Sequence, residues 1–178
     1  DLLRNSGKVC SYDISEKKVN LIRENIQRTG FTNIQSSVQD ALIFKEEDQE
    51  RADLVIADVP CSGMGILSKK PDIKYHLQEK QIEELANLSQ KILSNVVKYI
   101  KSGGTLIFST CTMNKTENDM NREWLMNHYD LEPVSIEEYL SEDLLKMGNN
   151  RETAKQGYLQ LFVAEEYDGF YLSKFIKK

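Results

Sequence analysis

The sequence predicts an α/β fold with a doubly wound, mostly parallel sheet whose last strand is antiparallel. Short apolar runs that end in an acidic residue alternate with stretches of helical periodicity, which is the order expected of such a sheet. Two β-rich runs then close the chain. A length of 178 residues is typical of one domain with a substantial core, so we expect a single domain over residues 1–178.

The first half of the chain predicts three strands and one helix. Residues 8–13 form a short run that ends in an acid, and Ser15 then reads as the N-cap of a helix that stops at Gly30. Residues 33–38 predict the next strand. Residues 52–58 form a mostly apolar run, which is typical of a strand buried on both faces of a parallel sheet.

The second half begins with a loop rich in glycine and proline. Asn114, with Glu117 three residues later, resembles a capping box for a helix that continues through Leu125. The remaining expected elements are the loop at 60–74, an amphipathic helix at about 78–100, a strand at 105–109, and closing strands at 158–162 and 170–175.

Composition limits the classes of protein to consider. Hydrophobic residues make up 40% and charged residues 29%, no apolar run reaches the length of a bilayer, and no signal-peptide pattern opens the chain. We therefore expect a soluble, cytoplasmic protein. The net charge of −5 does not by itself indicate a nucleic-acid partner, because phosphate neutralisation favours basic faces.

The three cysteines are odd in number and widely spaced, so a disulfide framework is not expected. With two histidines and no C-x-x-C pair, we expect no metal site. Cys10 lies in the middle of a predicted strand and is expected to be buried. Cys61 and Cys111 each follow a predicted strand end, where both sulfurs would face one cleft, although a buried apolar cysteine is the alternative interpretation.

Three predicted strands end near an acidic residue, namely Asp13, Asp40 and Asp58. Ligands of such sheets bind outside the carboxyl ends of the strands, where a carboxylate can accept hydrogen bonds from ribose hydroxyls. The set therefore predicts a nucleoside-containing cofactor. The alternative is that each aspartate caps the turn or helix that follows it.

Several segments together resemble the Sun/RsmB-type RNA (cytosine-5) methyltransferases. D-V-P-C-S-G at 58–63, followed by K-P-D-I-K at 70–74, is similar to the D-x-P-C-S-G and P-D-I-K segment of that family. S-T-C-T at 109–112 with E-N at 117–118 resembles its T-C-S/T and E-N segment, and Y-D-G-F-Y-L at 167–172 resembles its closing D-G-F-F strand. The resemblance covers nearly the whole chain.

This resemblance implies a Rossmann-like fold that uses S-adenosylmethionine to methylate carbon 5 of a cytosine in RNA. Ribosomal RNA is the preferred substrate and transfer RNA the second choice. The resemblance makes Cys111 the nucleophile that adds to carbon 6, and it implicates Cys61 in resolving the covalent adduct. Asp58 would hydrogen-bond the cytosine and stabilise its protonated ring nitrogen.

The same resemblance assigns the binding residues. Asp13 would hold the ribose of the cofactor and Asp40 its adenine edge, with Asp58 at the same sheet edge. Lys74 would contact a phosphate or the cofactor, with an exposed structural lysine as the alternative, and Pro60 would line the substrate side of the site.

Two features depart from the family pattern. The glycine-rich loop that approaches the methionine part of the cofactor, and the strand before it, are expected upstream of Asp1, and residues 1–5 read as the last turn of a helix. We therefore expect an N-terminally truncated catalytic domain without its first strand. Two further hypotheses are a non-catalytic RNA-binding or assembly module and an amino-group methyltransferase, although the latter usually carries an N/D-P-P-Y/F segment and needs no second cysteine.

Overall fold

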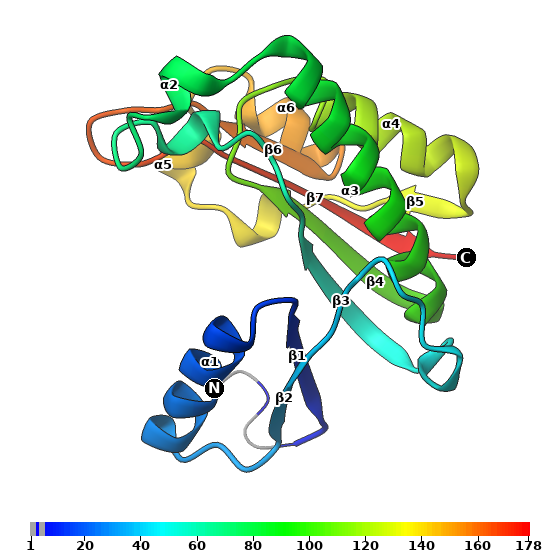
Figure 1. The fold of residues 1–178 in the computed structure, drawn as a ribbon. Coiled ribbons are helices and arrows are strands. Elements are labelled where there is room, and N and C mark those ends of the chain that lie inside the picture. The colour runs from blue at the N-terminus through cyan, green and yellow to red at the C-terminus, as the bar shows by residue number, and fades with distance from the viewer. Residues whose placement is uncertain (1–2, 4–5) are drawn as a thin grey trace. The chain divides into compact units, whose positions relative to one another are not determined.

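The computed structural model describes residue 3 and residues 6–178, without the side chain of His76. The helical turn expected over residues 1–5 lies, except for Leu3, outside this description. The chain divides into two compact units, Asp1–Phe44 and Lys45–Lys178. Figure 1 draws both, and each is described below by itself.

The first unit is a strand–helix–strand motif made of β1 (Val9–Asp13), α1 (Glu16–Thr29) and β2 (Ile34–Val38). The two strands pair in parallel. The Ser15 side chain caps the first turn of α1, and Gly30 ends the helix in the left-handed conformation at φ 73°, which glycine adopts without a Cβ clash. The caps predicted at both ends of this helix are therefore confirmed.

The prediction that Cys10 is buried is wrong, because this cysteine is exposed. Successive side chains of a strand point to opposite faces, and in β1 the partly buried positions are Val9, Ser11 and Asp13. Cys10 shares the other face with Tyr12, which is also exposed. An apolar run can thus predict the strand without predicting which of its faces is covered.

The second unit is built on a mixed sheet. In the part of the chain that the structure describes, its strand order is β3-β4-β7-β5, with β6 also paired to β7. β3 runs parallel to β4, while β7 is antiparallel to β4, β5 and β6, so β7 alone opposes the common direction. This confirms the antiparallel closing strand. The strands are β3 (Ala52–Asp58), β4 (Ile100–Thr110), β5 (Leu131–Pro133), β6 (Tyr158–Leu161) and β7 (Phe170–Lys177).

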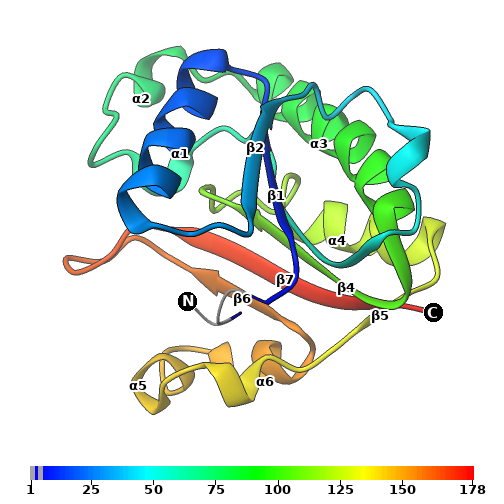
Figure 2. The ribbon, with the colours of Figure 1, turned by 90° about the horizontal axis from the view of Figure 1, so that it is seen from below.

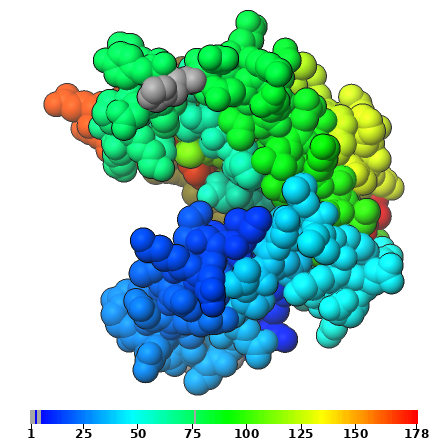
Figure 3. Space-filling model, viewed as in Figure 1, coloured from blue at the N-terminus to red at the C-terminus, as the bar shows by residue number. Residues whose placement is uncertain are grey.

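Helices cover both faces of this sheet. Figures 1 and 2 show α3 and α4 on one face and the α5–α6 segment on the other. In the space-filling view of Figure 3, the green atoms of α3 cover part of the visible face of this unit. The helices are α2 (Ile73–His76), α3 (Glu79–Tyr99), α4 (Asp119–His128), α5 (Glu142–Leu145) and α6 (Asn150–Lys155), and short 3₁₀ turns occur at Glu46–Asp48, Met64–Ile66 and Glu137–Tyr139.

The core of the second unit lies between α3, α4 and the sheet. Leu93 of α3, Phe108 of β4, Leu125 of α4 and Phe175 of β7 are all fully buried in it. Burial of each such side chain stabilises the fold by about 1.5–3 kcal/mol. Of the helices in the described residues, none is long and apolar enough to cross a membrane.

The prediction that β3 is buried on both faces is wrong. Ala57 is 7% exposed and belongs to the core, but Leu54 is 50% and Ile56 66% exposed. Alternation along the strand explains the difference, because within the second unit α3 and the rest of the core pack against the side of β3 that carries Ala57 and Val55.

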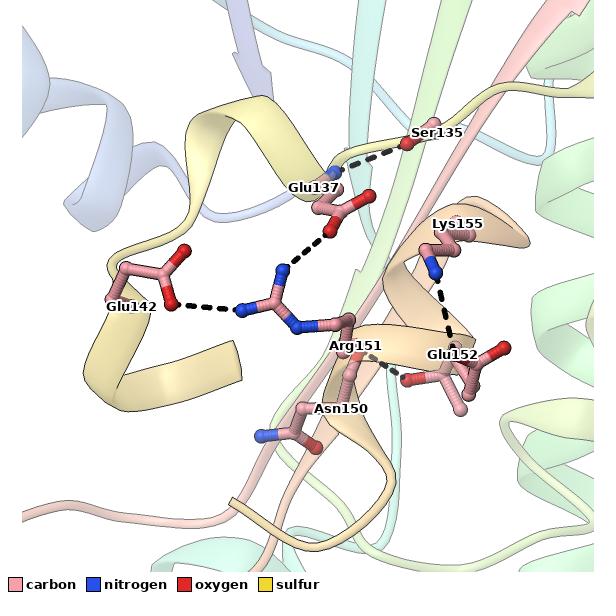
Figure 4. A network of polar contacts seen from close by, with 8 residues as sticks. Ser135, Glu137, Glu142, Asn150, Arg151, Glu152 and Lys155 are labelled. Carbon is pink, nitrogen blue, oxygen red and sulfur yellow. Dashed lines mark hydrogen bonds and ion pairs between the residues drawn. The ribbon is translucent and has the colours of Figure 1, made fainter. Parts of the chain in front are cut away.

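A second, smaller core lies against α5 and α6. Arg151 of α6 forms two ion pairs with the segment that precedes this helix. Figure 4 shows Arg151 reaching Glu137 with one guanidinium nitrogen and Glu142 with the other, at 2.7 and 2.8 Å. The apolar residues beneath the network are Ile136, Leu145, Ala154 and Leu159.

The capping box predicted at the start of α4 is wrong. Asn118 occupies the N-cap position of α4, and no side-chain hydrogen bond caps the helix there. Asn114 instead closes its own turn, because its side-chain oxygen accepts a 2.8 Å hydrogen bond from the Thr116 amide. Glu117 is buried and is bonded to a distant loop.

Candidate functional site

The structure brings two thiols together at the carboxyl ends of neighbouring strands. Cys61 follows β3 and Cys111 follows β4 directly, and because these strands run in parallel their ends lie at the same edge. The two Sγ atoms are 3.3 Å apart, and both side chains are partly buried. This distance allows one S–H group to donate a hydrogen bond to the other sulfur.

The loop that carries Cys61 is anchored on both sides. The Val59 amide donates to the Ser109 carbonyl at 3.1 Å, which extends the parallel pairing beyond the end of β3. The Ser89 hydroxyl of α3 donates to the Pro60 carbonyl at 2.8 Å. Pro60 is itself exposed, and its ring fixes the backbone φ immediately before the cysteine.

A buried carboxylate connects the two cysteine loops. Glu117 is 1% exposed and accepts hydrogen bonds from both the amide and the hydroxyl of Ser62, each at 2.6 Å. Its second oxygen also accepts from the Thr112 hydroxyl at 3.3 Å. Ser62 and Thr112 are the residues directly after Cys61 and Cys111, and their hydroxyl oxygens lie 2.9 Å apart.

Asn118 forms the next layer of this network. Its side-chain oxygen accepts from the Thr110 hydroxyl at 2.6 Å, and its amide nitrogen donates to the Thr112 carbonyl at 3.1 Å. The same nitrogen also donates to the Gln160 side-chain oxygen on β6 at 2.8 Å. The turn around Cys111 is therefore hydrogen-bonded on both sides of the cysteine.

Two glycines let a third loop approach the cysteines. The Gly65 amide donates to the Cys111 carbonyl at 2.9 Å, and the Gly65 carbonyl accepts from the Gly169 amide at 2.8 Å. A Cβ atom on Gly65 would stand 2.2 Å from the Gly169 oxygen, so only glycine permits this contact. Nearby, Lys69 forms an ion pair with Asp168 that holds the pKa of this carboxyl below its usual value.

Burial raises the pKa of the Cys61 thiol, and the hydrogen bond and charge of Cys111 add to the shift. Cys61 is therefore protonated at neutral pH. Because the thiolate is the reactive nucleophile, a thiol held in its neutral form is a poor nucleophile but a competent hydrogen-bond donor.

Asp58, the last residue of β3, is exposed at the same edge. One of its carboxylate oxygens accepts a hydrogen bond from the Ser109 hydroxyl at 3.1 Å. Ser109 pairs with Asp58 across the parallel ladder, so β4 orients this carboxylate directly.

An open cavity of about 470 Å³ adjoins Cys61, on the side of α2 and α3. Lys74 lies on α2 and is exposed, next to Ile73 in the cavity wall. The wall is mostly apolar, with a polar rim from the first turns of α3. The lining residues are Cys61, Ser62, Ile73, Leu77, Gln81, Glu84, Leu85 and Leu88.

Asp13 and Asp40 belong to the first unit. One oxygen of Asp13 accepts from the Ser15 amide at 2.8 Å, and the other lies 3.3 Å from the Lys18 ammonium. One oxygen of Asp40 accepts from the Leu42 amide at 2.9 Å. Both carboxylates therefore accept hydrogen bonds from the turns that follow their strands, as the capping alternative predicts. Both side chains remain partly accessible to solvent. Among residues 6–178, no cluster of three or more His, Cys, Asp or Glu side chains is suited to hold a metal ion.

Sequence reasoning missed Ser62, Thr112 and Glu117 as parts of the site. Glu117 also fitted a local capping pattern, and a local pattern takes no account of partners 55 residues away. The available signal was position, because Ser62 and Thr112 are the immediate neighbours of the two cysteines and Glu117 lies in the E-N segment.

Several known proteins are similar to this chain. The model of the family described as 16S rRNA methyltransferase RsmB/F matches residues 1–176. The probable ribosomal RNA small subunit methyltransferase B of Bacillus subtilis is 36% identical over 100% of this chain and 39% of its own length. The ribosomal RNA small subunit methyltransferase F of Escherichia coli O157:H7 is 30% identical over 98% of this chain and 36% of its own length.

A similar fold occurs in the crystal structure of NSun6 from Pyrococcus horikoshii with SFG. The TM-score is 0.79 at 24% identity, over 99% of this chain and 43% of that one. This likeness confirms the Rossmann-like methyltransferase fold predicted from the sequence. The chain spans less than two fifths of the length of the two curated relatives it matches.

Proposed function

Because the chain belongs to the RsmB/F family of 16S rRNA methyltransferases, we propose that it transfers a methyl group from S-adenosylmethionine to carbon 5 of a cytosine in ribosomal RNA. The family model spans both units, which supports treating residues 1–178 as one methyltransferase domain. The observation that carries the proposal is the pair of thiols 3.3 Å apart at adjacent strand ends. Methylation of an exocyclic amine needs no such pair.

The chemistry explains the need for two thiols. Carbon 5 of cytosine is a poor nucleophile, and addition of the Cys111 thiolate to carbon 6 moves electron density to carbon 5. S-adenosylmethionine would supply the methyl group that carbon 5 takes up. Resolution requires that the carbon 5 proton pass to water while the bond between carbon 6 and the Cys111 sulfur breaks. Cys61 is the group assigned to assist that step, because its S–H can stabilise the departing Cys111 thiolate.

The state of Cys61 supports this division of roles. Its raised pKa favours the thiol at neutral pH, and its S–H lies within hydrogen-bonding distance of the Cys111 sulfur, at 3.3 Å between the two Sγ atoms. Asp58, exposed at the same edge, is assigned to hydrogen-bond the cytosine and to stabilise the charge that develops on its ring nitrogen.

The cofactor assignment gives Asp13 the ribose hydroxyls and Asp40 the adenine edge of S-adenosylmethionine, and it also counts Asp58 among the cofactor-binding residues. The complex of NSun6 with SFG, an S-adenosylmethionine analogue, supports this class of cofactor. On the substrate side, Lys74 contacts an RNA phosphate and Pro60 shapes the turn against the base.

Calorimetric titration tests the cofactor assignment. S-adenosylmethionine binding is expected to weaken at least about tenfold in Asp13→Ala, because loss of hydrogen bonds to a charged acceptor costs about 1.5–3 kcal/mol. Asp53→Ala, an exposed aspartate of β3 paired only with Lys101 among the contacts of the described residues, is the matched control. Equal affinities for both variants would contradict the role of Asp13.

The product of the reaction tests the function as a whole. The complete gene product that contains this sequence is incubated with labelled S-adenosylmethionine and 16S ribosomal RNA, and the RNA is then digested to nucleosides for mass spectrometry. We expect label in 5-methylcytidine. Label in an amino-methylated nucleoside would contradict the proposal, and label in transfer RNA alone would change the substrate but leave the chemistry intact.

A further inference from the structure

Glu117 is a buried carboxylate to which the proposed reaction gives no task. Transfer of an ionised carboxylate out of water is costly unless hydrogen bonds compensate the loss of hydration. The compensation here comes from the Ser62 amide, the Ser62 hydroxyl and the Thr112 hydroxyl. All three donors belong to the residues that directly follow the two cysteines.

The position of these donors gives the carboxylate a geometric effect. One oxygen of Glu117 is bonded to the loop of Cys61, and the other is bonded to both cysteine loops. Charge-assisted hydrogen bonds are short and directional, and the two Ser62 contacts are 2.6 Å long. A shift of either loop would stretch bonds that are buried from water and therefore costly to lose.

We propose that Glu117 is a positioning residue that sets the separation of Cys61 and Cys111 by binding the residue after each of them. The effect of Glu117 on catalysis rests on the proposed function. Its effect on the distance between the two sulfurs does not depend on methylation. Glu117 touches neither substrate nor cofactor in this scheme and acts through Ser62 and Thr112.

Thiol–disulfide exchange measures the separation of the cysteines directly. In a buffer of reduced and oxidised glutathione, the thiols of Cys61 and Cys111 and one glutathione disulfide give one protein disulfide and two glutathione thiols. The equilibrium constant is the effective concentration of one cysteine toward the other. The exposed Cys10 is replaced by serine in every variant, so that it cannot form a mixed disulfide.

In this assay Glu117→Ala is expected to lower the effective concentration by about tenfold or more. Without the carboxylate the two loops move more freely, so the two sulfurs are close together for a smaller fraction of the time. Glu117→Gln is expected to recover most of the loss, because the amide oxygen still accepts from the Ser62 amide while the amide nitrogen donates to a hydroxyl. Glu123→Gln, an exposed glutamate of α4, is the matched control and should equal the parent protein.

An unchanged effective concentration in folded Glu117→Ala would overturn the inference. If that variant does not fold, Thr112→Val provides the test, because it removes the hydroxyl that joins the Cys111 loop to the network while keeping the side-chain shape. The expected result is then a smaller effective concentration, and an unchanged value would overturn the inference.

The methylation assay adds a second readout. Glu117→Ala is expected to lower kcat with little change in the KM for S-adenosylmethionine, because the cofactor contacts are kept. Failure of the two proposals is distinguishable. A parent protein without methylation but with a glutamate-dependent disulfide equilibrium contradicts the proposed function alone, while methylation with a glutamate-independent equilibrium contradicts this inference alone.

Discussion

Replacement of Cys111 by alanine is expected to abolish methylation, with a loss on the order of 10³-fold or more in kcat, because covalent activation of carbon 5 has no substitute in the site. The matched variant Cys61→Ala is expected to fail in a different way. It still forms the adduct between Cys111 and RNA but releases it slowly, since the residue assigned to resolution is absent.

For both variants, denaturing gel electrophoresis with labelled RNA detects the covalent adduct, and nucleoside analysis then detects the methylated product. We expect a protein–RNA band that survives denaturation for Cys61→Ala and no such band for Cys111→Ala. Cys10→Ala, which changes the exposed cysteine of the first unit, should behave like the parent protein. An adduct that forms in Cys111→Ala but not in Cys61→Ala would reverse the two roles, and adducts in both would remove the assignment altogether.

Gly65→Ala is expected to destabilise the protein and to displace the Cys111 turn. The new Cβ would stand 2.2 Å from the Gly169 oxygen and 2.7 Å from the Cys111 oxygen, and both are backbone atoms that no rotamer change can move. Overpacking of this kind costs about 1–3 kcal/mol or more, and here the relaxation must separate the loop at Gly169 from the loop at Cys111.

Equilibrium unfolding in urea, read as a shift of the midpoint at constant slope, measures this cost. Gly148→Ala is the control, since that glycine has positive φ but open space around it and should lose only the backbone preference of about 1–2 kcal/mol. Methylation should persist in Gly148→Ala and fall in Gly65→Ala. Equal losses of stability and activity in the two variants would contradict the steric argument.

Much of the fold follows from the sequence because the elements are locally encoded. Ser15 and Gly30 delimit α1, and the apolar stripe of α3 gives that helix within a residue of its bounds. Predictions of burial were less reliable. The strands that contain Cys10, Leu54 and Ile56 were predicted correctly, but these three apolar residues are exposed. Which face of a strand is covered depends on the elements packed against it, and the local sequence pattern does not show them.

The approach of the two cysteines was predictable for a related reason. Parallel strands place their carboxyl ends at one edge, so residues that follow two such strands must be neighbours if the strands are adjacent. Glu117 was not predictable in this way. Its spacing from Asn114 satisfies a helix-capping template, and only the tertiary pairing with Ser62 shows that the carboxylate is used elsewhere.

The direction of β7 also affects the order in which the site forms during synthesis. Because β7 opposes its neighbours, its first residues meet the end of β4, where Tyr171 pairs with Thr110. Tyr171 follows Cys111 by about 60 residues, a delay of roughly 3–12 s on the ribosome at about 5–20 residues per second. During that interval both cysteines have been synthesised but the Gly169 contact does not exist. The thiol pair is therefore among the last parts of this fold to reach its final geometry.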